Sequence, residues 1–213
     1  MIIDERLVTY INSLDTGNTE ILDTIEKEAL DTYVPIIRKE MQGFLKLLLA
    51  MKRPARILEV GTAVGFSAIL MAEYDPVECE ITTIENYEKR IPIARENFKR
   101  AGKEHQINLL EGDATEILKE LTKPYDFIFM DAAKGQYIHF MPDILRLLKP
   151  EGLLVSDNVL QDGDIIESHF IVTRRNRTIH KRMREYLYAL THSEELVTSV
   201  LPIGDGVTVS VRK

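Results

Sequence analysis

The chain of 213 residues has one cysteine and no tryptophan. With Cys79 alone no disulfide can form within the chain, which is expected of a protein in a reducing cytoplasm. The longest apolar stretch, 44–51, is interrupted by Lys46 and is far shorter than the roughly 20 residues that span a bilayer. The first residues also lack the basic and apolar regions of a signal peptide. We therefore expect a cytoplasmic protein without a membrane segment.

An excess of positive charge is also absent. The net charge is −7, and nucleic-acid-binding domains are usually basic overall, so attraction of the whole surface to nucleic acid is excluded. A local exception is a run of basic residues with no acidic residue among them: Arg174, Arg175, Arg177, Lys181, Arg182 and Arg184. This run is either a solvated helix face or a patch that binds phosphates. Both interpretations remain open from composition alone.

The hydrophobic pattern changes once along the chain. Residues 1–51 repeat apolar positions at helical spacing, whereas 56–213 alternate short β-rich runs with amphipathic segments, as parallel α/β units do. We predict one domain over 1–213, with N-terminal helices and an α/β core. The predicted strands are 56–60, 80–84, 107–110, 126–130, 152–156, 196–201 and 206–212. A turn-rich connection at 202–206 predicts that the last two strands form an antiparallel hairpin on an otherwise parallel sheet.

A glycine turn follows the first predicted strand. Gly61 and Gly65 frame it, and a missing side chain lets backbone approach a ligand closely. Thr62 and Ala63 stand where the dinucleotide motif G-x-G-x-x-G has its second glycine, so a pyrophosphate would fit poorly. The pattern favours a nucleoside cofactor that carries a sulfonium amino acid.

Acidic residues recur at the ends of the predicted strands. Glu85 is about 20 residues beyond the glycine turn, where a carboxylate can bind both ribose hydroxyls of an adenosine. We predict that Glu59 contacts the amino-acid end of the cofactor and that Asp113 accepts from the adenine amino group. Each residue alone is also explained as a strand end that meets solvent, but their succession along the sheet favours a cofactor site.

Four polar residues follow two further apolar runs. Asp131 and Lys134 come after 126–130, and Asp157 and Asn158 come after 152–156. If these strands are neighbours, their ends lie about 5 Å apart. Hard oxygen ligands without cysteine or histidine favour Mg²⁺, or else Mn²⁺ or Ca²⁺, over zinc. Lys134 is placed to act as a base, although a loop lysine by itself is usually only solvent-exposed.

Five motifs carry a resemblance to a known family: Glu59-Val-Gly-Thr-Ala-Val-Gly-Phe-Ser67, Ile84-Glu85, Gly112-Asp113-Ala114, Met130-Asp-Ala-Ala-Lys134 and Ser156-Asp-Asn158. Over essentially its whole length the chain resembles the metal-dependent O-methyltransferases related to catechol and caffeoyl-CoA O-methyltransferases. The resemblance implies a Rossmann-like class I methyltransferase fold with a seven-stranded sheet, and a homodimer. It also implies that Asp131, Asp157 and Asn158 bind the metal and that Lys134 is the base. The residues implied to line the S-adenosylmethionine site are Met41, Gly61, Ser67, Glu85, Asp113, Ala114 and Asp131.

The substrate is a separate question. The chain has Ala133 where plant caffeoyl-CoA enzymes carry an acidic residue, and it lacks the tryptophan walls of animal catechol enzymes. Within the family it most resembles the bacterial tRNA 5-hydroxyuridine methyltransferases, which make 5-methoxyuridine at the wobble position. This resemblance implies that the tRNA anticodon loop is the partner, and the tRNA-binding residues would be Arg174, Arg175, Arg177, Lys181 and Arg182. The alternatives are methylation of a small catechol-like molecule and a non-catalytic RNA-binding protein.

Overall fold

The computed structural model describes residues 3–168 and 171–213. The helices of this part are α1 (Glu5–Ser13), α2 (Glu20–Asp31), α3 (Lys39–Lys52), α4 (Phe66–Tyr74), α5 (Ile91–Arg100), α6 (Ala114–Glu120), α7 (Tyr137–Leu147) and α8 (Arg177–Thr191), with 3-10 turns η1 (Lys134–Gln136) and η2 (Gln161–Ile166). The strands are β1 (Arg56–Val60), β2 (Glu80–Glu85), β3 (Ile107–Glu111), β4 (Tyr125–Met130), β5 (Leu148–Ser156), β6 (Leu196–Leu201) and β7 (Val207–Arg212). None of the described helices is long and apolar enough to cross a membrane.

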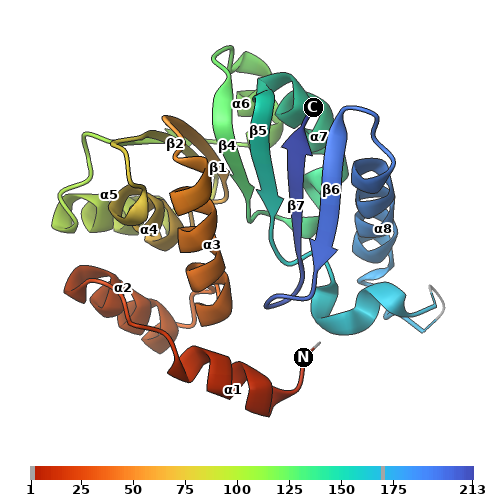
Figure 1. The fold of residues 1–213 in the computed structure, drawn as a ribbon, viewed down its shortest axis with the longest axis horizontal. Helices are drawn as coiled ribbons and strands as arrows, with labels where there is room; N and C mark the ends of the chain where they lie inside the picture. Colours follow the sequence, from red (N-terminus) through yellow and green to blue (C-terminus); the bar gives the residue numbers. More distant parts are fainter. Residues whose placement is uncertain (1–2, 169–170) are drawn as a thin grey trace.

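The strands form one seven-stranded sheet in the order β3-β2-β1-β4-β5-β7-β6. Strands β1 to β5 are parallel, and β7 pairs antiparallel with both β5 and β6. The prediction of a mostly parallel sheet with a terminal hairpin and N-terminal helices is therefore confirmed (Figure 1). The chain order reverses between β1 and β4, and ligands of open α/β sheets bind in the crevice at such a reversal.

Both faces of the sheet are covered. Successive strand side chains point to opposite faces, so Ile57 and Phe127 belong to the apolar cluster under α3, α4 and α5, whereas Leu58 and Ile128 belong to the cluster under α6, α7 and α8. Figure 1 shows these two groups of helices on either side of the sheet. Burial on both faces explains why residues 127–130 of β4 form a continuous apolar run in the sequence.

Most predicted strand ends agree with the structure to within one residue. The exception is β5, which begins at Leu148 rather than at residue 152. Leu148 pairs with Tyr125, and the register then shifts before Phe127 pairs with Leu153. The intervening polar residues break the apolar pattern, so the early part of the strand has no signal in the sequence.

A buried tyrosine ties together the chain ends of β4 and β5. The hydroxyl of Tyr137 lies 3.1 Å from the carbonyl oxygens of both Met130 and Asp157, and it accepts the N–H of Ala132 at 3.2 Å. Burial raises the pKa of Tyr137 well above its usual value, so the hydroxyl keeps its proton. Tyr137 thereby fixes the two strand ends relative to each other.

We expect Tyr137→Phe to lower the free energy of unfolding by about 1–2 kcal/mol, because the part-buried N–H of Ala132 would lose its acceptor. Urea unfolding followed by circular dichroism measures this change. Tyr10→Phe, at a tyrosine that is 62% exposed, is the matched control and should change stability very little. Equal stability of the two variants would show that the Tyr137 hydroxyl does not hold the strand ends.

Candidate active site

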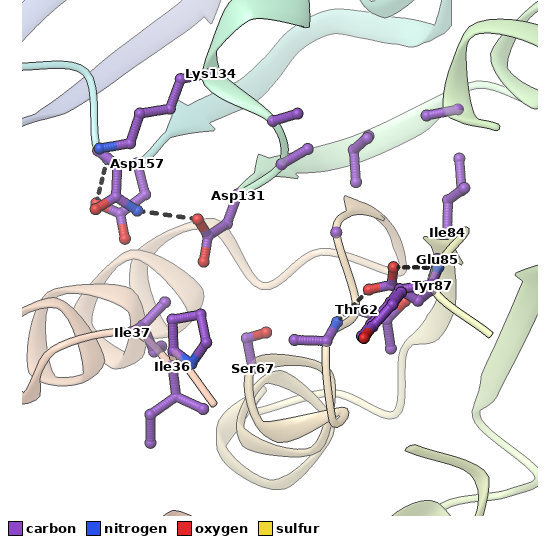
Figure 2. Close-up of a pocket in the computed structure, with 18 of the residues that line it drawn as sticks. Ile36, Ile37, Thr62, Ser67, Ile84, Glu85, Tyr87, Asp131, Lys134 and Asp157 are labelled. Carbon is purple, nitrogen blue, oxygen red and sulfur yellow. Dashed lines mark hydrogen bonds between the residues drawn. The ribbon is translucent and has the colours of Figure 1, made fainter. Parts of the chain in front are cut away.

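A cavity of about 790 Å³ opens where β1, β2, β4 and β5 end. Its walls come from the glycine turn after β1, the end of β2, the turns after β4 and β5, and the segment 35–38 before α3. Figure 2 shows Asp131, Asp157 and Lys134 at one end of this pocket, and Glu85 and Tyr87 at the other. The pocket thus has two ends with different chemistry.

The glycine turn is required by a close approach of two loops. Gly61 has φ +104°, and a Cβ there would lie 2.1 Å from the carbonyl oxygen of Asp131. A Cβ on Gly65, at φ +86°, would lie 2.5 Å from the ring of Phe98. Gly61 lines the pocket, whereas Gly65 is needed for packing of α5 beneath the turn.

Glu85 is held rigidly at the cofactor end. Its Oε2 accepts the N–H of Ala63 at 2.7 Å, and its Oε1 accepts the N–H groups of Asn86 and Tyr87 at 3.0 and 2.9 Å. A carboxylate has about four acceptor sites, so Glu85 retains acceptor capacity for a ribose hydroxyl. The structure places this residue where the sequence predicted it.

Glu59 lies behind the pocket wall rather than on it. It is fully buried and does not line the pocket. Its carboxyl group accepts the hydroxyls of Ser67 and Thr83, both at 2.5 Å. Burial raises the pKa of Glu59 to about 7, against the lowering effect of these two hydrogen bonds. Glu59 therefore supports the wall from behind, and its direct contact with a cofactor stays a prediction.

The other predicted cofactor residues lie on the pocket wall. Met41, Ser67 and Ala114 line it, as does Asp113. Asp113 is also the N-cap of α6, since its side chain accepts the N–H of Thr115 at 2.7 Å. This bond lowers the pKa of Asp113. One of its oxygens is thus already used by the helix.

The predicted metal residues come together at the opposite end. Asn158 donates its Nδ2–H to Asp131 Oδ1 at 3.0 Å, and its backbone N–H donates to Asp157 Oδ1 at 2.7 Å. Burial raises the pKa of Asp131, and burial together with the charge of Asp131 raises that of Asp157. The charge of Asp131 therefore disfavours the ionised form of the neighbouring Asp157.

These residues fit a hard divalent cation. A cation would stabilise the ionised form of both carboxylates, against the burial that raises both pKa values and the charge of Asp131 that further raises the pKa of Asp157. Carboxylate and amide oxygens are the ligands that Mg²⁺ and Ca²⁺ prefer. Within the described residues, no group of three or more His, Cys, Asp or Glu side chains could hold a metal by itself. A site here therefore depends on the Asn158 amide as well as on the two carboxylates.

The partner of Lys134 was not predicted from the sequence. Its Nζ lies 2.9 Å from Oδ2 of Asp205, in the connection between β6 and β7. The Asp205 side chain is 2% exposed, and it also lines the pocket. An aspartate in a turn between glycines is usually a turn former, so only the hairpin's pairing with β5 could have revealed this contact.

The basic run lies mainly on α8, outside the pocket wall. Helix α8 packs against η1, which carries Lys134. Arg182 donates to the carbonyl oxygen of Gly135 at 3.1 Å, and Arg177 donates to that of Val172 at 3.2 Å. Lys181 pairs with Glu185 at 3.7 Å, and the remaining members, Arg174, Arg175 and Arg184, are exposed.

Comparisons with known proteins agree with this arrangement. A model of the O-methyltransferase family matches residues 12–213. A catechol O-methyltransferase of Niastella koreensis is 37% identical over 173 residues, which cover 78% of each chain. A caffeoyl-CoA O-methyltransferase of Medicago sativa is 31% identical over 180 residues, or 79% of this chain and 71% of the relative.

Solved structures agree as well. A Staphylococcus aureus structure with 31% identity has a TM-score of 0.90 and covers 99% of this chain and 100% of that one. An SAH-bound Podospora anserina methyltransferase with 27% identity has a TM-score of 0.87 and covers 98% and 94%. The fold and the pocket define a Rossmann-like methyltransferase. The chain belongs to the O-methyltransferase family and is an S-adenosylmethionine-dependent enzyme of the catechol and caffeoyl-CoA type.

Glu59 generates a prediction about stability and pH. A carboxyl group whose pKa is raised to about 7 in the folded protein contributes stability that is complete below its unfolded pKa of about 4.3 and is lost as pH rises through 7. This loss should be roughly 4 kcal/mol. We expect Glu59→Gln to remove this pH-dependent loss of stability, because an amide can form hydrogen bonds with both hydroxyls without ionising.

The measurement is urea unfolding of wild type and Glu59→Gln between pH 4.5 and 8. The difference should shift in favour of the variant as pH rises, and Glu88→Gln, at an exposed glutamate, should show no such trend. Parallel curves for wild type and Glu59→Gln would contradict the raised pKa.

Proposed function

We propose that the protein transfers the methyl group of S-adenosylmethionine to one of two adjacent oxygens of a catechol-like substrate, with the help of a divalent cation. The observation that carries this proposal is the hydrogen-bonded group of Asp131, Asp157 and Asn158 beside Lys134, at one end of the pocket whose other end holds Glu85. Mg²⁺ is the expected cation, with Mn²⁺ or Ca²⁺ as alternatives.

The cofactor would lie between the two ends of the pocket. Glu85 would bind the ribose hydroxyls, and Asp113 and Ala114 would border the adenine. The backbone of Gly61 and the hydroxyl of Ser67 would border the methionine part. The sulfonium would then face the end of the pocket that contains Asp131, which is the orientation that methyl transfer requires.

The chemistry follows from this placement. A cation bound by Asp131, Asp157 and Asn158 would orient both substrate oxygens and make the reacting hydroxyl more acidic. Lys134 would accept the hydroxyl proton at Nζ. S-adenosylmethionine would supply the methyl group: the deprotonated oxygen would form a bond to the methyl carbon, the carbon–sulfur bond would break, and its electron pair would remain on the sulfur of S-adenosylhomocysteine.

A small aromatic diol is supported as substrate by the names of the curated relatives and by the shape of the pocket. Ile36 and Ile37 belong to the wall, and Figure 2 shows them on the side of Asp131 and Ser67. An apolar wall next to a polar oxygen site suits a ring with two adjacent hydroxyls.

A second candidate is 5-hydroxyuridine at the tRNA wobble position, which presents a hydroxyl next to the C4 carbonyl. The specific observation in its favour is the packing of basic α8 against η1, which carries Lys134. Exposed arginines on and just before α8 suit backbone phosphates, and a base of a single-stranded loop can enter a pocket at low cost. The homodimer and the cytoplasmic location stay predictions under both candidates.

The metal part is tested with Asp157→Asn. We expect binding of Mg²⁺, measured by calorimetry, to weaken and methyl transfer to fall on the order of 100-fold, because the loss of a cation removes several kcal/mol of stabilisation. Binding of S-adenosylhomocysteine should persist, which separates a metal defect from unfolding. Full activity in the presence of EDTA would exclude a metal-assisted reaction.

The substrate part is tested with the double variant Arg174→Glu/Arg175→Glu, which leaves the structural bonds of Arg177 and Arg182 intact. If tRNA is the substrate, methylation of tRNA that contains 5-hydroxyuridine should weaken by roughly tenfold, with a smaller salt dependence. Methylation of catechol should not change.

The matched control is Lys99→Glu/Lys123→Glu, which alters the net charge equally at exposed positions on α5 and before β4. Equal loss of tRNA methylation in both double variants would show that the added negative charge repels tRNA wherever it is placed, and that Arg174 and Arg175 make no specific contact. Label that enters catechol and not tRNA in the wild type would exclude the RNA candidate.

A further inference from the structure

Asp205 is a buried carboxylate that uses both of its oxygens. Oδ2 accepts a hydrogen bond from the Nζ of Lys134 at 2.9 Å, and Oδ1 accepts the backbone N–H of Asp162 in η2. The Asp205 side chain is 2% exposed, whereas that of Lys134 is 34% exposed. An almost immobile group therefore holds the end of a long and flexible side chain.

The surroundings of Asp205 fix it from several directions. Gly204 and Gly206 flank it with positive φ, at +59° and +83°, and the N–H groups of Val159 and Leu160 donate to the carbonyl oxygens of Gly206 and Asp205. These bonds attach the hairpin turn to the chain that leaves β5. The turn thus brings its carboxylate to the same edge of the sheet as the turn after β4.

The same carboxylate reaches the rim of the pocket. Asp162, whose N–H it accepts, forms an ion pair at 3.0 Å with Arg38 in the segment before α3. Arg38 lines the pocket together with Asp205. Lys134 is thereby linked through two aspartates to the segment that forms the outer wall.

We infer that Asp205 is a positioning residue for Lys134, an inference that rests on the proposed role of Lys134 as base. A lysine has four rotatable side-chain bonds, and without a fixed partner its amine samples many positions. A reacting group misplaced by about 1 Å can lower a rate 100-fold. Asp205 keeps the Nζ at the end of the pocket where Asp131 and Asp157 lie.

A second ion pair in the chain provides a matched control. Lys149 Nζ lies 2.8 Å from Asp126 Oδ1 at the start of β4, and the Lys149 side chain is 35% exposed. Asp126 does not line the pocket. The two pairs have lysines of equal exposure, but only one of them is at the pocket.

The experiment compares Asp205→Asn with Asp126→Asn. An asparagine at 205 keeps an acceptor for the N–H of Asp162 but cannot pair with an ammonium, and Asp205→Ser is the second variant if the first does not fold. Two quantities are measured: steady-state constants with the acceptor that the wild type methylates, and the rate at which dilute acetic anhydride labels each lysine, followed by mass spectrometry in EDTA.

We expect Asp205→Asn to lower kcat by about 10- to 100-fold, with less than a threefold change in KM for S-adenosylmethionine. Labelling of Lys134 should accelerate severalfold while that of Lys149 stays constant. Asp126→Asn should give the reverse labelling pattern with an unchanged kcat. A purely structural role of Asp205 predicts no selective change at Lys134.

Labelling of Lys134 that is equal in wild type and Asp205→Asn overturns the inference, as does a kcat within twofold of the wild type. If the wild type methylates neither catechol nor tRNA, the proposed function fails. The labelling rates still decide whether Asp205 holds Lys134, so the two failures are distinguishable.

Discussion

Two carboxylates buried in one place repel each other, and the site is arranged around that repulsion. Asp131 and Asp157 follow β4 and β5, whose parallel pairing brings their turns together. Around them lie an amide donor from Asn158, the fixed hydroxyl of Tyr137, and the ammonium of Lys134. Placing two negative charges close together is unfavourable for folding by itself. Because the surrounding hydrogen bonds already hold the carboxylates in place, a cation that neutralises them would bind to a site already formed.

The two halves of the sheet contribute different chemical groups to the pocket. The ends of β1 and β2 supply rigid acceptors and a glycine turn, while β4, β5 and the hairpin turn supply charge. Gly61 joins the halves, because its missing side chain lets the two loops touch. A donor molecule held on one half and an acceptor held on the other would therefore meet at the point where the strand order reverses.

The sequence predicted most of the fold because buried parallel strands and amphipathic helices have clear periods. Strands β1 and β6 begin and end where the pattern predicted, and the strand-end residues of the pocket could be placed from their position after each apolar run. The early part of β5 could not, because a polar segment interrupts its pattern. The pairing of Lys134 with Asp205 also could not be predicted from the sequence, since it joins residues 71 positions apart. Similarly, the spacing of the basic residues did not predict that Arg177 and Arg182 donate to backbone carbonyls while Arg174 and Arg175 remain exposed.

The position of β7 between β5 and β6 has a consequence for the order of assembly. A ribosome releases the strands from β1 to β7, so β5 stays an open edge with unpaired backbone groups until the last strand of the hairpin arrives. A growing chain can thus build the wall of β1 and β2 and bring together Asp131 and Asp157 early. Asp205, which holds Lys134, joins the fold only with the final hairpin. In a nascent chain the residues proposed to bind the cation would therefore come together before Lys134 is fixed in position.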